Sequence, residues 1–414
     1  SKIPTDVTLR VFKVANTDTF SWPIDSSFAI DNIKRKIYNR DSLPFGTVLP
    51  RTMNFIITPY SFSKIIIEDA SGKRDYTSTD DSINVTEPFK VTVKGVDSLI
   101  TITYDVQINI RKTNPDTLDW KKITDNFYSG NIYGQKAFIH NQNDLLVFVN
   151  SGLLNYRLSS PITDGTNWTK NSIPTLPPTA RIESMVHFDG KYVVPTFDSE
   201  LYLSTDGVDW TKVDMPVNVL HIYGSVLNKT TEKQTLILLG EKEGRKYFLH
   251  TDNVTDWVET NLEPTSNFPV SGSTSIVSST AGYDRLSILG GVNNAGVLIN
   301  DVYQMYFEKG VLRASNNLVA PNMVYTAREG ASVIAYGDKW WWIMGGRTAP
   351  FEYSKEIYES SDNGFTWLIT TQNIIFPATF DTRRNASVLV DKHNYVWVIG
   401  GNNRIQHRDV WKGA

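Results

Sequence analysis

Three hydrophobic stretches that end in paired glycines decide the fold of this chain: Leu286-Ser-Ile-Leu-Gly290-Gly291, Trp341-Trp-Ile-Met-Gly345-Gly346 and Val396-Trp-Val-Ile-Gly400-Gly401. Each stretch has the length and composition of a buried strand. Glycine accepts backbone angles that other residues avoid and lets a neighbouring backbone come close, so each pair predicts a sharp turn at the strand end. Weaker copies are Leu236–Gly240 and Leu145–Asn150. The chain is therefore expected to repeat one sheet unit.

Tryptophans follow these strands in similar short phrases. The phrases lie roughly 40–55 residues apart, which is the repeat length of propeller blades. One unit lacks its tryptophan and has Gly310-Val-Leu-Arg313 at that place. The repeat predicts a six-bladed β-propeller, with blades at about 128–173, 179–216, 219–263, 269–320, 325–378 and 383–414. The phrases are Asp119-Trp120, Asn167-Trp168, Asp209-Trp210, Asp256-Trp257 and Thr366-Trp367.

The last unit is one strand short. The chain ends at Asp409-Val-Trp-Lys-Gly-Ala414, and a lone strand around 117–124 precedes the first unit. We expect this strand to complete the last blade, because the pairing removes an exposed sheet edge and ties the ends of the ring together.

The first part of the chain has a different sequence pattern, without the repeat. Alternating runs such as Thr8–Val14, Phe89–Lys94 and Leu99–Ile110 are typical of strands with one buried face. They predict an immunoglobulin-like β-sandwich at residues 1–112. The polar segment 111–116 contains a proline and reads as a linker, so the propeller is expected at 113–414. The predicted fold class is all-β.

The amino-acid composition excludes several kinds of functional site. The 414 residues include no cysteine, which excludes disulfides, thiolate metal sites and cysteine nucleophiles. The formal net charge is −3, and no basic stripe points to nucleic acid. The six histidines are scattered without metal-ligand spacing, so neither a metal nor a cofactor is expected. No apolar run approaches the roughly 20 residues that a membrane helix needs.

Two motifs resemble known propeller repeats. Asn300-Asp-Val-Tyr303 and Arg408-Asp-Val-Trp411 follow the double glycines, and this combination resembles Kelch repeats. The first three units share only the repeat length. Ser360-Ser-Asp-Asn-Gly-Phe-Thr-Trp367 and the shorter Ser204–Trp210 are similar to the Asp-box of sialidase-type propellers. We interpret the Asp-box as a structural turn, in which Asp accepts hydrogen bonds from local amides, Gly takes a positive φ and Trp is buried.

The N-terminal part carries a further resemblance. Phe20-Ser-Trp-Pro-Ile-Asp25, Tyr38–Thr47, Asp81–Asn84 and Phe89–Val93 are similar to segments of a family of Bacteroidetes surface lipoproteins. Members of that family join an immunoglobulin-like module to a Kelch-like propeller. The resemblance implies a secreted or outer-surface protein with a processed N-terminus, held at a membrane only by a lipid anchor that this chain lacks. A monomer is expected.

A ligand site is expected at the mouth of the central channel, where the innermost strand of each blade begins. Aligning the six strand starts by their apolar anchors gives one level of residues at the mouth. A second level lies two positions on and faces the same way, because side chains alternate along a strand. The first level is Asn131, Arg181, His221, Ser271, Arg328 and Arg383, and the second is Tyr133, Glu183, Tyr223, Ser273, Gly330 and Asn385. The candidate ligand-binding residues are Asn131, Tyr133, Arg181, Glu183, His221, Tyr223, Arg328 and Arg383.

Two interpretations of these levels are open. Arginine binds carboxylates through two parallel hydrogen bonds and tyrosine offers a stacking face, which favours a cup for an anionic or hydroxyl-rich ligand. Alternatively, the arginines pair with Glu183, Glu329 and backbone carbonyls and hold the tops of the blades together.

Three functions follow from these interpretations. The first is a non-catalytic extracellular binding module, with a glycan or a protein as ligand at the channel mouth. The second is a glycan-active enzyme, a sialidase-like hydrolase or a lyase, that uses the arginines, Tyr133, Tyr223 and Glu183. The third is a structural surface protein, which predicts a plugged channel. A galactose-oxidase-like activity is excluded, because its Cys–Tyr crosslink cannot form without cysteine.

Overall fold

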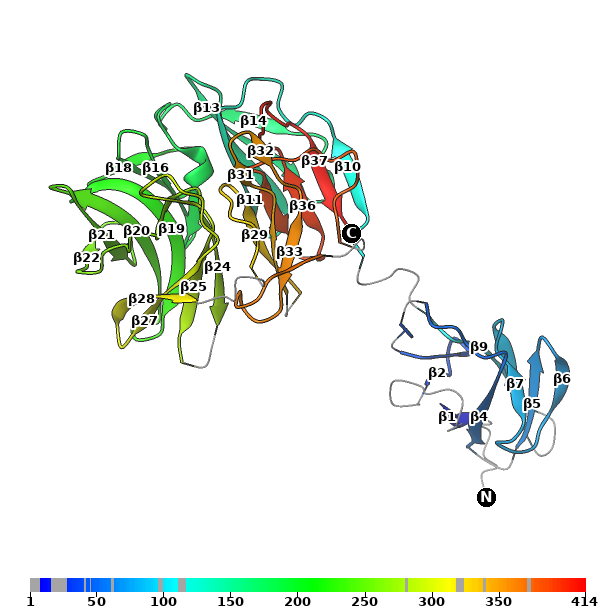
Figure 1. Cartoon of the computed structure of the whole chain (residues 1–414). Helices are drawn as coiled ribbons and strands as arrows, with labels where there is room; N and C mark the ends of the chain where they lie inside the picture. Colours follow the sequence, from blue (N-terminus) through cyan, green and yellow to red (C-terminus); the bar gives the residue numbers. More distant parts are fainter. Residues whose placement is uncertain are drawn as a thin grey trace. The chain divides into compact units, whose positions relative to one another are not determined.

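The chain folds as two compact units, Ser1–Thr117 and Leu118–Ala414 (Figure 1). The structure is a computed structural model that describes residues 8–15, 28–40, 42–44, 46–60, 63–95, 100–110, 117–279, 282–317, 324–337, 340–370 and 374–414. The phrase 20–25 and the predicted linker 111–116 lie outside these residues. Within them, no helix is long and apolar enough to cross a membrane.

The described residues of the first unit form two sheets. One has the order β1-β4-β7, and β1 and β4 run antiparallel. The other has the order β2-β3-β9-β8-β5-β6, with β3 and β9 parallel. The strands are β1 (Leu9–Val14), β2 (Ala29–Asp31), β3 (Lys36–Tyr38), β4 (Thr52–Pro59), β5 (Lys64–Asp69), β6 (Gly72–Tyr76), β7 (Ser82–Asn84), β8 (Phe89–Lys94) and β9 (Thr101–Gln107).

One hydrophobic core joins the two sheets of this unit. Buried and more exposed side chains alternate along β4, as expected for a strand with one face on the core. The ring of Phe55 on β4 lies 5.1 Å from that of Phe12 on β1 and 5.7 Å from that of Phe89 on β8. All three rings are buried, and their contacts hold the sheets face to face.

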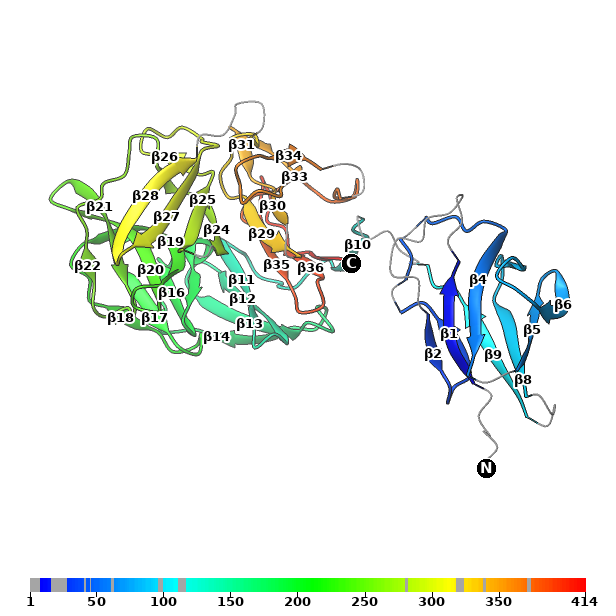
Figure 2. The same ribbon diagram turned by 90° about the horizontal axis from the view of Figure 1, so that it is seen from below.

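The second unit contains six four-stranded sheets in its described residues (Figure 2). Neighbouring strands within these sheets are antiparallel. The first three sheets are β11 (Gly134–His140), β12 (Asp144–Asn150), β13 (Asn155–Pro161) and β14 (Thr169–Ser172); β15 (Val186–Phe188), β16 (Lys191–Pro195), β17 (Leu201–Ser204) and β18 (Thr211–Val213); and β19 (Asn218–Asn228), β20 (Lys233–Lys242), β21 (Arg245–Thr251) and β22 (Val258–Glu259).

The other three sheets carry the double glycines. They are β24 (Thr274–Ser279), β25 (Asp284–Leu289), β27 (Val302–Glu308) and β28 (Val311–Asn317); β29 (Ser332–Tyr336), β30 (Trp340–Met344), β33 (Ile357–Ser360) and β34 (Leu368–Ile369); and β35 (Ser387–Val390), β36 (Val396–Ile399), β37 (Val410–Gly413) and β10 (Trp120–Thr124). Two short pairs extend the loops: β23 (Pro269–Ser271) with β26 (Val292–Asn293), and β31 (Arg347–Ala349) with β32 (Glu352–Tyr353).

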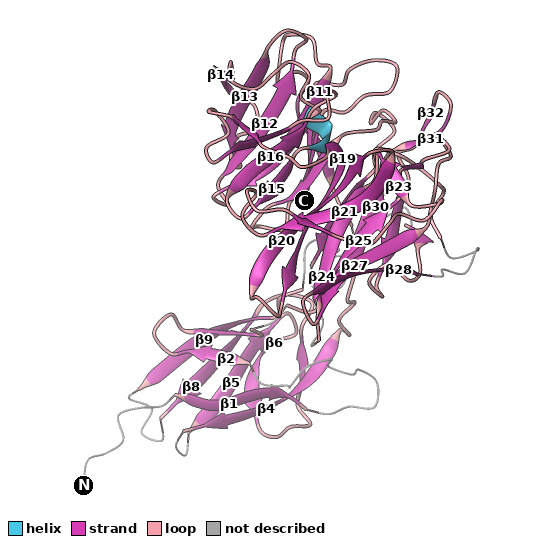
Figure 3. Cartoon of the chain, turned by 90° about the vertical axis from the view of Figure 1, so that its left-hand side faces the viewer, coloured by secondary structure: helices cyan, strands magenta, loops and turns pink. Residues whose placement is uncertain are grey.

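The innermost strands form a ring. β15 contacts β19, β19 contacts β24, β24 contacts β29, β29 contacts β35, and β35 contacts β11. A short 3-10 turn, η1 (Ile182–Ser184), lies between β11 and β16 and completes the circle (Figure 3). This arrangement is that of a β-propeller, in which each sheet buries its faces against its neighbours.

The strand before the first sheet pairs with the end of the chain. Trp120 on β10 lies opposite Gly413 on β37, and Lys121 lies opposite Lys412. The Trp120 ring is 4.5 Å from that of Phe376. The sequence predicted this pairing, and the structure confirms it.

The double glycines bring adjacent sheets together. Gly291 has φ 100° and its N–H donates to the carbonyl oxygen of Arg328 at 2.7 Å, while the N–H of Gly346 donates to that of Arg383 at 2.9 Å. A Cβ on Gly291 would lie 2.6 Å from the Ser271 oxygen, so no other residue fits there. The glycines therefore allow the close approach that the sequence indicated.

The predicted turn at Ser360–Trp367 is built on Asp362. Its carboxylate accepts hydrogen bonds from the N–H groups of Phe365 and Thr366 at 3.0 and 2.9 Å. The indole N–H of Trp367 donates to the Gly364 oxygen at 3.1 Å, and the ring is 2% exposed. Burial tends to raise the pKa of Asp362, but the hydrogen bonds from Thr366, Ser360 and Phe365 together outweigh it and lower the pKa below its usual value. The turn stabilises the sheet edge.

Candidate functional site

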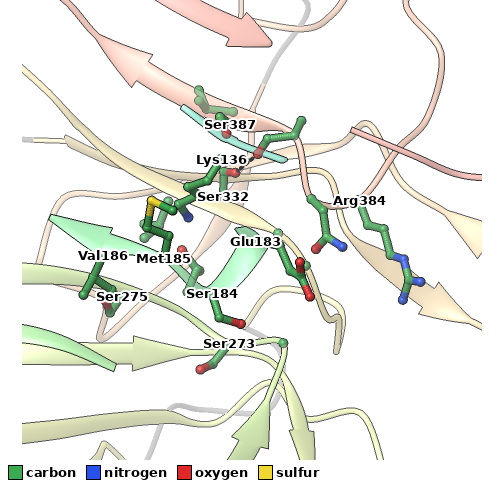
Figure 4. A pocket seen from close by; sticks show the side chains of 18 of the residues that line it. Lys136, Glu183, Ser184, Met185, Val186, Ser273, Ser275, Ser332, Arg384 and Ser387 are labelled. Carbon is green, nitrogen blue, oxygen red and sulfur yellow. Dashed lines mark hydrogen bonds between the residues drawn. The ribbon is translucent and has the colours of Figure 1, made fainter. Parts of the chain in front are cut away.

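A cavity of about 420 Å³ lies inside the ring of inner strands (Figure 4). A purely structural propeller predicts a plugged channel. The cavity shows instead that side chains leave open space inside the ring. Its walls include serines from several sheets, and six acidic or basic residues line it. These are Lys136, Arg181, Glu183, His221, Glu329 and Arg384.

In the part of the chain that the structure describes, two of these acidic or basic side chains have no hydrogen-bonding partner. Lys136 comes from β11 and Glu183 from η1, and in Figure 4 both border the same space. Within the described residues, neither side chain makes a hydrogen bond or an ion pair. Burial lowers the pKa of the Lys136 amine, and the negative charge of Glu183 opposes this effect. A charge in such a place is normally paired, so these two groups are available to a ligand.

Glu183 is held in place by packing. Its Oε2 lies 2.9 Å from the position that a Cβ on Gly134 would occupy. Gly134 begins β11, two residues before Lys136. The absence of a side chain at Gly134 thus gives the carboxylate its room beside the strand that carries the lysine.

His221 on β19 is a neutral imidazole. Its Nε2 lies 3.0 Å from the Ser273 hydroxyl, and its buried Nδ1 has no partner among the described residues. Burial, together with the positive charges of Arg181 and Lys136, lowers the pKa of His221 to about 3. Its ring contacts Tyr223, whose hydroxyl donates to the Pro269 oxygen at 2.8 Å. The histidine therefore contributes no charge near neutral pH.

The carboxylate of Glu329 forms ion pairs with two arginines. The Nε of Arg347 donates to Glu329 Oε1 at 2.7 Å, and Arg384 donates to the same oxygen. Arg384 also donates to Asn402 Oδ1 at 3.2 Å. This cluster, Glu329 with Arg347 and Arg384, is called the Glu329 clamp below. It joins the sheets of β29 and β35 and stabilises the cavity wall.

Two family models match the chain. One, described as the DUF6242 beta propeller domain, matches residues 114–414, and the other, described as Domain of unknown function (DUF6242) N-terminal domain, matches residues 11–108. This chain belongs to the DUF6242 family. A comparison with curated proteins gave no match.

Solved structures similar to the DUF6242 chain include a structure of YjhT, with 13% identity, a TM-score of 0.48, and coverage of 68% of this chain and 93% of that one. A fungal alcohol oxidase of the AA5 family in complex with copper has 13% identity and a TM-score of 0.48, over 72% and 76%. A protein from Dyadobacter fermentans has 11% identity and a TM-score of 0.47, over 71% and 98%. Likenesses of this degree carry no argument about chemistry.

Four of the eight candidate residues of the DUF6242 chain line the cavity: Arg181, Glu183, His221 and Tyr223. Arg181 donates to the Leu220 oxygen at 2.7 Å, and its guanidinium lies 5.7 Å from the centre of the exposed Phe197 ring. Asn131 and Tyr133 are exposed and are not part of the lining.

Arg328 and Arg383 are buried in the sheets rather than facing the cavity. Arg383 is 1% exposed and donates to both carboxylate oxygens of Asp409, at 2.6 and 3.1 Å, and to the Gly400 oxygen at 2.9 Å. Arg328 is 0% exposed and donates in the same way to the Gly345 oxygen at 2.9 Å. The structural interpretation of these two arginines is the one their contacts support.

A one-residue error in the alignment of the strand starts explains why Arg328 and Arg383 do not line the cavity. Thr274, Ser332 and Ser387 each lie opposite the residue that precedes a double glycine. Gly272, Gly330 and Asn385 are therefore equivalent, and all three have positive φ. The left-handed turn sends Glu329 and Arg384, not the preceding arginines, to the cavity.

The sequence alignment missed Lys136, Glu329 and Arg384. In the first sheet, it began at Asn131, but β11 starts at Gly134, so the strand residue that reaches the cavity is Lys136. A lysine within the otherwise apolar run Lys136–Ile139 was the available signal. Among the described residues, no group of three or more metal-ligating side chains comes together.

Proposed function

We propose that the propeller domain binds a glycan unit with an acidic group in the central cavity. The observation that carries the proposal is the pair Lys136 and Glu183, two side chains that line the cavity and make no hydrogen bond or ion pair with the described residues. Desolvating unpaired charges is unfavourable, and a polar ligand that contacts both removes the cost. The cavity volume of about 420 Å³ falls within the usual range for small-molecule sites.

The surroundings favour a carbohydrate acid over an apolar ligand. Lys136 and Arg181 supply positive charge for a carboxylate, and Glu183 accepts hydrogen bonds from hydroxyl groups. The Phe197 ring is 71% exposed and lies against Arg181, which lines the cavity. An exposed aromatic ring next to a cation offers an apolar face to a sugar ring.

The proposal includes the architecture of the chain and the place where it works. We infer that the six four-stranded sheets are six Kelch-like blades, that the turn at Asp362 is an Asp-box, and that the first unit is an immunoglobulin-like module. We further infer that the chain works outside the cell or at its surface as a monomer, where a glycan ligand would be met.

Calorimetric titration of the whole chain tests the binding proposal. The probes are methyl glycosides of glucuronic and galacturonic acid, with methyl glucoside as the neutral counterpart. We expect the acids to bind and the neutral sugar to bind more weakly. Lys136→Met should weaken binding of the acids by about 10- to 150-fold, because charge-assisted hydrogen bonds contribute about 1.5–3 kcal/mol.

Lys121→Met is the matched control, since Lys121 is exposed on β10 in the same domain. It should leave the affinity unchanged. Equal affinity for the neutral sugar, or unchanged affinity in Lys136→Met, would show that the acidic ligand does not occupy this cavity.

A further inference from the structure

Two exposed aromatic rings belong to loops next to charged residues of the cavity. Phe197 is 71% exposed and Tyr133 is 68% exposed, and neither of them lines the cavity. Single exposed apolar side chains are common on protein surfaces, so the meaning of these two depends on what surrounds them.

Both rings lie at the end of the propeller where β11 and β15 begin. Tyr133 precedes β11, the first strand of its sheet, and Phe197 lies between β16 and β17, the second and third strands of the next sheet. Because neighbouring strands are antiparallel, the start of the first strand and the connection between the second and third lie at the same end of a sheet. The two sheets meet at this end, since the Cβ of Ile182, just before β15, lies 3.6 Å from the Cβ position of Gly134.

Phe197 is connected to the cavity through Arg181. Arg181 lines the cavity, and its guanidinium lies 5.7 Å from the centre of the Phe197 ring. Its Nη1 also donates to the Leu220 oxygen at 2.7 Å, which fixes the guanidinium. The N–H of Phe197 donates to the Thr179 oxygen at 2.8 Å. The N–H of Arg181 donates to the Pro195 oxygen at 2.9 Å. These bonds hold the loop that carries the ring against the segment that carries the arginine.

Tyr133 is held close to Glu183 by its neighbour in the chain. It directly precedes Gly134, whose Cβ position lies 2.9 Å from Glu183 Oε2. The N–H of Tyr133 donates to the Asn150 oxygen at 2.8 Å. Its Cε2 lies 3.3 Å from the Cβ position of Gly152, which has φ 95°. The absence of a side chain at Gly152 therefore leaves room for the tyrosine ring.

We propose that the ligand is a chain of acidic sugar units, in which one unit occupies the cavity and its neighbours stack on Phe197 and Tyr133. This inference rests on the proposed function, because it uses the same cavity and the same acidic glycan and adds the neighbouring units. A ligand confined to the cavity would not reach these rings, since neither of them lines it. The ligand that uses both the cavity and the rings is longer than one unit.

The residues beside the rings favour a sugar chain over an apolar partner. Asp198 follows Phe197, Asn131 precedes Tyr133 by two positions, and both polar side chains are exposed. A sugar unit presents C–H groups on its faces and hydroxyl groups on its edge. An aromatic ring with a hydrogen-bonding side chain next to it can contact both.

Calorimetric titration of the whole chain with oligomers tests the inference. The probes are the dimers and trimers of galacturonic acid and of glucuronic acid, each compared with the methyl glycoside of the same acid. We expect the trimer to bind more tightly than the methyl glycoside. Phe197→Ala and Tyr133→Ala should each weaken binding of the trimer by about two- to tenfold, the range for one aromatic contact. Neither change should alter the affinity for the methyl glycosides.

Two further variants separate the rings from the cavity. Lys136→Met should weaken binding of glycosides and oligomers by the same factor, because only the unit in the cavity reaches the lysine. Phe365→Ala is the matched control for the rings and should leave every affinity unchanged. Phe365 is 43% exposed, but it lies between β33 and β34, the third and fourth strands of a sheet, and therefore at the opposite end of the propeller.

The outcomes distinguish this inference from the proposed function. Methyl glycosides that bind as tightly as the trimers would leave the proposed function intact and refute the chain. A trimer affinity that is unchanged in both Phe197→Ala and Tyr133→Ala would also refute it, and would assign the rings to a partner of another class, such as a protein. Absence of binding by any of the probes would refute both the inference and the proposed function.

Discussion

The two halves of the propeller domain hold their inner strands together by different means. In the half built on β24, β29 and β35, a run of backbone bonds supplements side-chain links such as the Glu329 clamp: the N–H of Gly330 donates to the Gly272 oxygen at 2.8 Å, and that of Asn385 to the Gly330 oxygen at 2.7 Å. In the half built on β11, β15 and β19, side chains contribute to the links, beside a backbone hydrogen bond from the Val219 N–H to the Ser199 oxygen at 2.9 Å. Arg181 reaches the Leu220 oxygen, and Ser275 at the boundary donates to the Tyr223 oxygen at 2.5 Å.

The difference extends to the charged residues. In the glycine-rich half, Arg328, Arg383 and Glu329 are each bound to protein groups. In the other half, Lys136 and Glu183 are not. In the glycine-rich half, these charged residues stabilise the fold. In the other half, Lys136 and Glu183 line the cavity without contributing an ion pair to the fold. Departures from local rules of this kind are expected where a protein binds or reacts.

Arg383→Ala is expected to have the largest effect on stability. The side chain of Asp409 is 13% exposed, and without Arg383 its charge would be left buried and unpaired. Breaking a buried ion pair costs about 3–5 kcal/mol. The free energy of unfolding, measured by urea titration with tryptophan fluorescence, should fall by that amount. Arg181→Ala, in the other half, removes one hydrogen bond and should cost about 1 kcal/mol. Equal losses would contradict the division into halves.

His221 should make the side-chain-linked half sensitive to acid. Its pKa falls from 6.5 to about 3 on folding, so the unfolded chain takes up the proton first as the pH drops. The stabilisation is complete above pH 6.5 and is lost as the pH falls toward 3, with a slope of about 1.4 kcal/mol per pH unit. Urea titrations from neutral pH to about pH 4 should give a shallower slope for His221→Phe than for the unchanged chain. An identical slope would show that the imidazole is not buried in neutral form.

Two glycines with similar backbone conformations test the backbone links. Gly291 has φ 100°, and a Cβ there would lie 2.6 Å from the Ser271 oxygen and 2.9 Å from the Ser273 nitrogen. Gly190 has φ 73° in the other half, with no atom within 4 Å of the Cβ position. Both changes to Ala carry the left-handed penalty of about 1–2 kcal/mol, and Gly291→Ala should add about 1–3 kcal/mol of overpacking. Equal shifts of the thermal midpoint would mean that the backbone yields easily at Gly291.

The β-propeller was predictable from sequence because its signals are local. A glycine pair after an apolar strand and a tryptophan at the end of a unit each have one physical reason, and both recur at a fixed period. The pairing of β10 with β37 followed from the missing strand in the last unit. The pairs β23–β26 and β31–β32 were not predicted, because they are only two or three residues long and Arg347–Ala349 has no strand-like alternation.

The site was predictable only in part. Tyr223, two residues after His221 on β19, lines the cavity as strand alternation predicted. Glu183 also lines it, but from the 3-10 turn η1, where strand alternation does not apply. Alternation cannot reveal the left-handed turn at Gly330 and Asn385, which turns Arg328 and Arg383 into the sheets. Which charges remain without a partner depends on contacts between residues far apart in the chain, such as that between Glu329 and Arg384.

The smallest expected effect on the free energy of unfolding distinguishes the roles of the two carboxylates that line the cavity, those of Glu329 and Glu183. Glu329→Gln removes the charge that Arg347 and Arg384 share and should cost about 1–3 kcal/mol of unfolding free energy. Glu183→Gln removes a charge that no protein group binds, so the change should stay within about 0.5 kcal/mol. Urea titrations of both variants measure the difference. A loss in Glu183→Gln as large as that in Glu329→Gln would mean that Glu183 is a structural residue, and the cavity would then lack the uncommitted pair on which its ligand depends.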